Sequence, residues 1–159
     1  MFVAGEDFYF LAYTTLLILD ELDCHSPAKL YRDIRGIAYV ADIIGHESDL
    51  KLAISEKPLS LAQISRLSLL YDRAVARRAP FERVIAALAE RGLIELVGSD
   101  PKGAYLKADA RQLQLDDDIF AGERGRISQL RRVSRLSIAG KAKVQERLFQ
   151  GHGVRTWDD

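Results

Sequence analysis

Residues 8–22 (FYFLAYTTLLILDEL) limit the possible folds of this chain most strongly, because they are apolar almost throughout. Such a pattern predicts a helix without a polar face, which has to be buried on more than one side. The simpler interpretation makes it the central helix of the core. In the alternative, a second polypeptide covers part of it, and the candidate protein-interface residues are Phe8, Phe10, Leu11 and Tyr13.

The chain has 159 residues, of which 48% are hydrophobic and 29% charged, as expected for one globular domain with its own core. The apolar run is shorter than the roughly 18 residues that span a bilayer, and no basic segment precedes it as in a signal peptide. The single cysteine, Cys24, allows no internal disulfide. We therefore expect a cytoplasmic protein that does not bind a membrane.

Helical periodicity continues after the first run. Leu30, Ile34, Ile37, Ala41 and Ile44 form one stripe and predict a helix over residues 27–44. Ser26 is expected to cap this helix, and Gly45 to end it in a left-handed conformation.

Further helices are predicted along the middle of the chain. Residues 46–58 can form a short helix. Ser60 is expected to cap a longer helix, and Pro80 to begin another that ends at Gly92.

Two short apolar strings, residues 93–97 and 104–108, flank the turn GSDPKG and predict a β-hairpin. Two helices followed by a hairpin are typical of a winged helix. The expected fold is mainly α with a small β-hairpin: a winged-helix-like domain with N-terminal helices and a basic C-terminal helix. The expected boundaries are 1–112 for that domain, 113–125 for an acidic, glycine-containing linker, 126–150 for the basic helix and 151–159 for a flexible tail.

The net charge is zero, but the charge is unevenly distributed. Residues 1–60 carry an excess of five acids, whereas residues 124–147 carry an excess of seven bases. This asymmetry favours an acidic partner for the basic segment, either the DNA backbone or an acidic protein surface. Arg66, Arg73 and Arg77 form a separate stripe, for which a solvated helix face is the alternative interpretation. The candidate contact residues are Arg66, Arg73, Arg77, Arg83, Lys102, Arg126, Arg131, Arg132 and Arg135.

Motifs for catalysis or metal binding are missing from the sequence. No phosphate-binding glycine loop, H-E-x-x-H or C-x-x-C occurs. Cys24 and His25 are adjacent but have no second pair of ligands, and residues 116–118 are more typical of a solvated acidic linker than of a cation site. We expect no catalytic residue, metal or cofactor, and a protein that is not an enzyme.

The second helix of a helix-turn-helix reads base edges with its first residues. Here those residues include Phe81, Glu82 and Arg83, of which only Arg83 is a good partner for a base or phosphate. Sequence-specific DNA reading is therefore poorly supported, and a protein–protein module is favoured.

The segments GEDFYFLAYTTLLILDEL, LYRDIRGIAYVADIIG and ALAERGLIEL…AYLKAD together resemble the small middle components of bacterial ABC-three-component defence systems, in particular the small subunit of Lamassu-type anti-phage systems. The similarity covers about residues 5–110 and rests on the layout of helices and hairpin. It implies a non-catalytic subunit that joins an SMC- or Rad50-like ATPase to an effector, often a nuclease. Sequence-independent contact with double-stranded DNA is a further implication, and no functional residue of the family is carried over.

Three functions stay open on the sequence. The first is the adaptor subunit of an ATPase complex in anti-phage or anti-plasmid defence. The second is a winged-helix transcriptional regulator, and the third is an accessory subunit of a condensin-type complex.

Overall fold

The structure is a computed structural model that describes residues 4–107, 112–115, 118–133 and 136–157; the side chains of 4–7, 132 and 133 are not described. The chain is mainly helical, with one two-stranded antiparallel sheet, as the sequence predicts. The helices and strands of the first part are α1 (Ala4–Glu21), α2 (Arg35–Ile44), α3 (Glu47–Ala53), α4 (Leu61–Ala76), α5 (Arg78–Glu90), β1 (Ile94–Val97) and β2 (Gly103–Leu106). The elements that follow are η2 (Asp118–Phe120), α6 (Ala121–Val133), η3 (Leu136–Ile138), α7 (Lys141–Leu148) and η4 (Gln150–His152).

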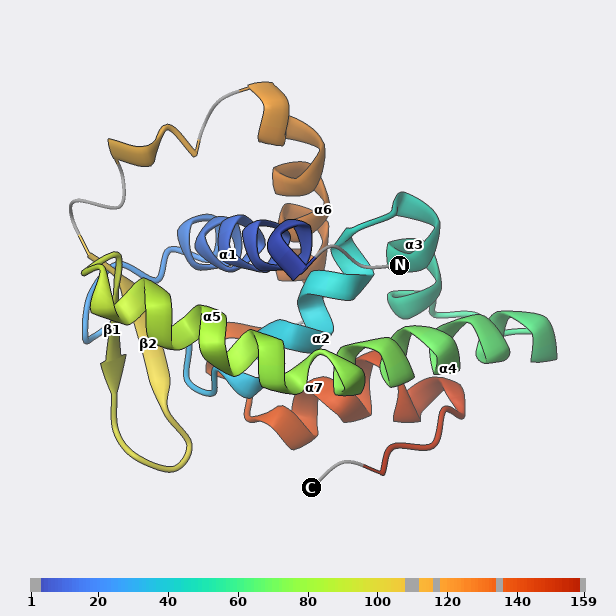
Figure 1. Cartoon of the computed structure of the whole chain (residues 1–159). Helices are drawn as coiled ribbons and strands as arrows, with labels where there is room; N and C mark the ends of the chain where they lie inside the picture. The colour runs from blue at the N-terminus through green and yellow to red at the C-terminus, as the bar shows by residue number, and fades with distance from the viewer. Residues whose placement is uncertain (1–3, 108–111, 116–117, 134–135, 158–159) are drawn as a thin grey trace.

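The core is built around α1 and α2. Helix α1 packs against α2, α5, α6 and β2, with α6 above it and α5 below it in Figure 1. Helix α2 also contacts α3, α4 and α7. In the C-terminal half of α1, Leu16 to Leu19 are each at most 2% exposed. The chain itself therefore buries most of the apolar run, which agrees with the simpler of the two interpretations.

An aromatic cluster joins α2, α4 and the C-terminal segment. Tyr39 and Tyr71 stack with their ring centroids 5.6 Å apart, and Phe149 forms a T-shaped contact with each of them. After η4 the chain returns to the same cluster, where the Trp157 amide donates to the Tyr71 hydroxyl at 2.9 Å. The described part of the C-terminal tail thus packs on α4, although the sequence suggests a flexible tail.

The predicted helix over residues 27–44 is wrong in its first half, because α2 begins only at Arg35. Tyr31 instead lies beside β2, and its amide and carbonyl form a pair of hydrogen bonds with Ala104 at 2.8 and 2.9 Å. Pairing with the hairpin satisfies the backbone of this segment and buries the Tyr31 ring completely. This tertiary contact overrides the helical stripe.

The predicted helix boundaries vary in accuracy. Ser60 caps α4 in a capping box with Gln63, and Gly92 adopts a positive φ of 71° after α5; both predictions are confirmed. Gly45 is not left-handed, with φ −61° and ψ −30°, because the chain enters α3 almost at once.

The basic segment is not one helix over residues 126–150. It is divided into α6, η3 and α7, and Gly140 precedes α7. Leu136 in η3 and Val144 in α7 are both buried.

The two strands of the hairpin pair in the register Ile94 with Leu106 and Val97 with Gly103. Helices α4 and α5 precede it and follow each other nearly end to end (Figure 1). Only Arg77 separates them, whereas a helix-turn-helix has a turn of about three or four residues. In the described part of the chain, none of the helices combines the length and the apolar character that crossing a membrane requires.

Candidate functional site

The first turns of α1 carry aromatic side chains on the surface of the molecule. Tyr9, Phe10 and Tyr13 are 63%, 39% and 44% exposed, and we call them the aromatic stripe. Tyr9 and Tyr13 are four residues apart and therefore neighbours on one face, with Phe10 beside them. Leu16 to Leu19, further along α1, are buried, so these exposed aromatic groups lie before the buried part of the central helix.

A shallow hollow of about 160 Å³ adjoins the stripe between α1 and α5. Phe8, Tyr9 and Tyr13 line it from α1, and Leu88 of α5 and Arg91 just after that helix line the other side. Its wall is mostly apolar, so the stripe and the hollow form one continuous surface.

Two of the stripe residues are held in place by neighbouring groups. Tyr13 stacks on Phe120 of η2, with a centroid separation of 5.6 Å and an interplanar angle of 29°. The guanidinium of Arg77 lies 5.5 Å from the centre of the Phe10 ring. The aromatic side chains are thus ordered in advance, which lowers the entropy lost when a partner binds.

The sequence also suggested Phe8 and Leu11 as interface residues. Phe8 is half-buried beside Tyr9. Leu11 is only 1% exposed and packs in the core, so it does not belong to the exposed surface of α1. Sequence reasoning chose Leu11 because it could not tell which side of a uniformly apolar helix faces outward.

Two of the candidate contact residues, Arg66 on α4 and Arg77 at its end, take partners within the chain. Arg66 binds the buried carboxylate of Asp49 through two hydrogen bonds of 2.9 and 3.1 Å. Arg77 pairs with the equally buried Asp42. Both arginines therefore hold α4 on α2 and α3, and much of their charge is neutralised internally.

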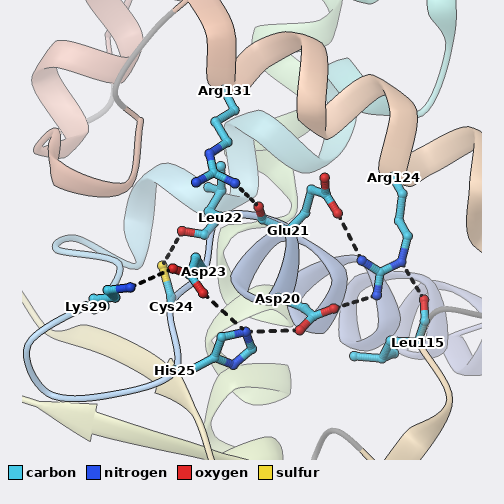
Figure 2. A network of polar contacts seen from close by, with 10 residues as sticks. All are labelled: Asp20, Glu21, Leu22, Asp23, Cys24, His25, Lys29, Leu115, Arg124 and Arg131. Atoms are coloured by element: carbon cyan, nitrogen blue, oxygen red, sulfur yellow. Dashed lines mark hydrogen bonds and ion pairs between the residues drawn. The ribbon is translucent and has the colours of Figure 1, made fainter.

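The basic face of α6 is directed at the acidic C-terminal end of α1 (Figure 2). Arg131 donates to the Glu21 carbonyl at 3.0 Å, near the negative end of the helix dipole. Arg124, a residue that sequence reasoning did not select, binds Asp20 and Glu21 at 2.5 and 2.9 Å.

The other basic candidates lie in several places. Arg126 bonds to the Ile44 carbonyl and lies 3.4 Å from Glu123. Arg73 on α4, Arg83 on α5 and Lys102 in the hairpin turn are exposed. The Arg132 side chain and Arg135 lie outside the described residues.

Cys24 and His25 belong to the same network as Arg124. His25 Nε2 lies 3.1 Å from Asp20, and burial raises the pKa of the Cys24 thiol to about 12. A thiol with so high a pKa is a poor nucleophile at neutral pH. Within the described ranges, no three His, Cys, Asp or Glu side chains are grouped so that they could hold a metal ion.

Sequence reasoning missed a second concave site, which lies between α5, the hairpin turn and the start of α2. It has a volume of about 320 Å³ and brings together Arg35, Arg78, Lys102 and Lys141. These residues are far apart in the sequence, so no local pattern could reveal that they share one site.

No protein-family model, curated protein or solved structure matches this chain.

Proposed function

We propose that this chain is a non-catalytic adaptor that binds a partner protein through the aromatic stripe of α1. The observation that carries the proposal is the exposure of Tyr9, Phe10 and Tyr13 on the same helix whose Leu16 to Leu19 lie in the core. Exposed apolar patches on small proteins mark interaction sites. Tyrosine and phenylalanine are enriched in the buried centres of interfaces, and a tyrosine hydroxyl also tolerates water in the free protein.

The proposed partners follow from the resemblance to small subunits of Lamassu-type systems. They are an SMC- or Rad50-like ATPase and an effector, which we propose to be a nuclease, in a cytoplasmic anti-phage or anti-plasmid complex. Contact with double-stranded DNA is a secondary part of the proposal and rests on the exposed Arg73 and Arg83.

We propose that α4, α5 and the β1–β2 hairpin form a winged-helix-like scaffold that serves protein contacts and does not read DNA. The order of α4, α5 and the hairpin supports it. The single-residue connection at Arg77 speaks against a DNA-reading helix-turn-helix, and so does the exposed Glu82 next to Arg83. The adaptor is therefore favoured over a transcriptional regulator.

The test is affinity purification of the tagged full-length protein from its native cells, followed by mass spectrometry. We expect an SMC-like ATPase to copurify with the wild type and to be lost with the double variant Tyr9→Ser/Tyr13→Ser. The matched control is Leu61→Ser/Leu69→Ser, which removes two exposed apolar side chains from α4 and should retain the ATPase.

Thermal unfolding of each variant shows whether it is folded. Equal recovery of the ATPase with the stripe variant would overturn the proposed surface. Absence of any ATPase from the wild-type eluate would overturn the proposed partner.

A further inference from the structure

The basic pocket between α5, the hairpin turn and the start of α2 differs from the aromatic stripe in its chemistry. Its volume of about 320 Å³ is at the lower end of the range for binding pockets and suits one large side chain better than a cofactor. It shares no lining residue with the hollow beside the stripe. A protein partner could therefore occupy it while the stripe is bound.

The floor of the pocket is apolar. Phe81 and Ile85 project from α5, Leu96 comes from β1, and Tyr39 and Ala38 come from α2. Phe81 and Ile85 are each 3% exposed, so they belong to the packed core and form a firm surface. An inserted apolar side chain would meet rigid walls, which is the arrangement found at the energetic centres of interfaces.

The rim of the pocket is basic. Arg35, Arg78, Lys102 and Lys141 line it, against the two carboxylates of Glu82 and Asp100. Arg78 lies 3.6 Å from Glu82, and Lys102 is exposed at the hairpin turn. Arg35 is itself paired with the buried Asp33, so these four cations face three carboxylates, and the remaining positive charge favours a negatively charged ligand.

One buried carboxylate positions two groups of this rim. Asp33, whose side chain is 2% exposed, binds the Arg35 guanidinium at 2.9 and 2.8 Å and accepts from the Lys141 amide at 3.0 Å. The Ile34 amide donates to the Lys102 carbonyl at 3.0 Å, which fixes the hairpin turn to the same segment. The basic groups therefore surround the apolar floor before any ligand binds.

We propose that the basic pocket binds an acidic segment of a partner protein that inserts one large apolar side chain. The apolar floor takes the inserted side chain, and the rim pairs with aspartates or glutamates on either side of it. A nucleic acid fits less well, because its phosphates need cations but gain nothing from an apolar floor. The pocket would give the proposed adaptor a second binding site, and its test does not depend on the stripe.

The probe is a labelled short peptide with one phenylalanine between runs of aspartate and glutamate, titrated into the full-length protein by fluorescence anisotropy. Two further peptides replace the phenylalanine by alanine, or all the acids by asparagine and glutamine. We expect both replacements to weaken binding by roughly tenfold or more, because each removes one of the two recognised features.

The variants are placed at exposed positions so that folding is preserved. Ala86→Glu puts bulk and negative charge at the pocket wall, and Lys102→Glu reverses one rim charge. The matched controls are Ala62→Glu and Arg73→Glu, exposed positions on α4 that do not line the pocket. We expect both pocket variants to lose binding, and both controls and the stripe variant to keep it.

Three results would overturn the proposal. The first is no binding of the phenylalanine peptide to a folded wild-type protein. The second is equal binding of the alanine peptide, which would mean nonspecific charge attraction. The third is displacement of the peptide by a short DNA duplex whose own binding is lost in the Ala86→Glu variant. That result would assign the pocket to nucleic acid.

Discussion

At the scale of single residues, the clearest feature is that buried aspartates are each matched with an arginine. Asp33, Asp42 and Asp49 are at most 5% exposed and pair with Arg35, Arg77 and Arg66. A buried carboxylate is costly unless a cation and hydrogen bonds compensate it. In the sequence, Arg66 and Arg77 resemble unpaired DNA contacts. Their partner carboxylates lie 17 and 35 residues away, so no local pattern reveals the pairing.

The pH dependence of stability is expected to report on Asp33. Burial opposes ionisation of this carboxyl, but hydrogen bonds from Arg35 and from the Lys141 amide outweigh burial, so its folded-state pKa lies below the ordinary value. A depressed pKa contributes stability above the unfolded-state value of about 4, and this contribution is lost as the pH falls through the folded-state pKa. At neutral pH we expect Asp33→Asn to lower the free energy of unfolding by about 1–3 kcal/mol.

Urea unfolding between neutral pH and about pH 3 measures this effect. The difference between wild type and Asp33→Asn should shrink as the solution is acidified below pH about 4. A difference that stays constant over the whole range would show that the ionised carboxylate contributes nothing.

At the scale of elements, the hairpin is attached to the segment before α2 by a close backbone approach. A Cβ atom added to Gly103 would lie 2.7 Å from the Leu30 Cδ1 atom and 2.9 Å from the Tyr31 carbonyl oxygen. Only glycine allows β2 to approach Tyr31 so closely. This contact replaces the helix that the sequence predicts for residues 27–34.

Gly103→Ala is therefore expected to lower the free energy of unfolding by about 1–3 kcal/mol, because the hairpin or the Tyr31 segment has to shift. The matched control is Gly125→Ala in α6, where nothing lies within 4 Å of an added Cβ. That change should raise stability by about 0.5–1 kcal/mol, since alanine favours the helix. Chemical denaturation measures both, and a neutral Gly103→Ala would contradict the close contact.

At the scale of the whole molecule, the acidic N-terminal part of the chain and the basic residues 124–147 contact each other. Arg124 of α6 binds Asp20 and Glu21 at the end of α1 and also donates to the Leu115 carbonyl at 2.6 Å (Figure 2). The charge asymmetry thus has a structural role in addition to any role in binding a partner. It closes the C-terminal helices onto the central helix.

Arg124→Gln is expected to destabilise the protein by about 1.5–3 kcal/mol, because it removes charge-assisted hydrogen bonds at a side chain that is only 20% exposed. Arg147→Gln is the control: Arg147 is exposed on α7, and its replacement should change stability by less than about 0.5 kcal/mol. Both are read from urea midpoints. Equal effects would contradict a specific role of Arg124 in docking α6.

The sequence by itself determined the elements whose signals are local. Examples are the Ser60 cap of α4, the glycine stop at Gly92 and the hairpin. Caps, turns and periodic stripes depend on residues a few positions apart, so a single chain reveals them.

Only the tertiary structure decided which face of α1 is exposed, which arginines are paired, and where Arg35, Arg78, Lys102 and Lys141 meet. These features depend on contacts between distant segments, and such contacts can override local preference. Tyr31 shows this directly. The sequence around it favours a helix, but backbone pairing with Ala104 places Tyr31 in an extended segment, where its ring is buried and its backbone groups are hydrogen-bonded.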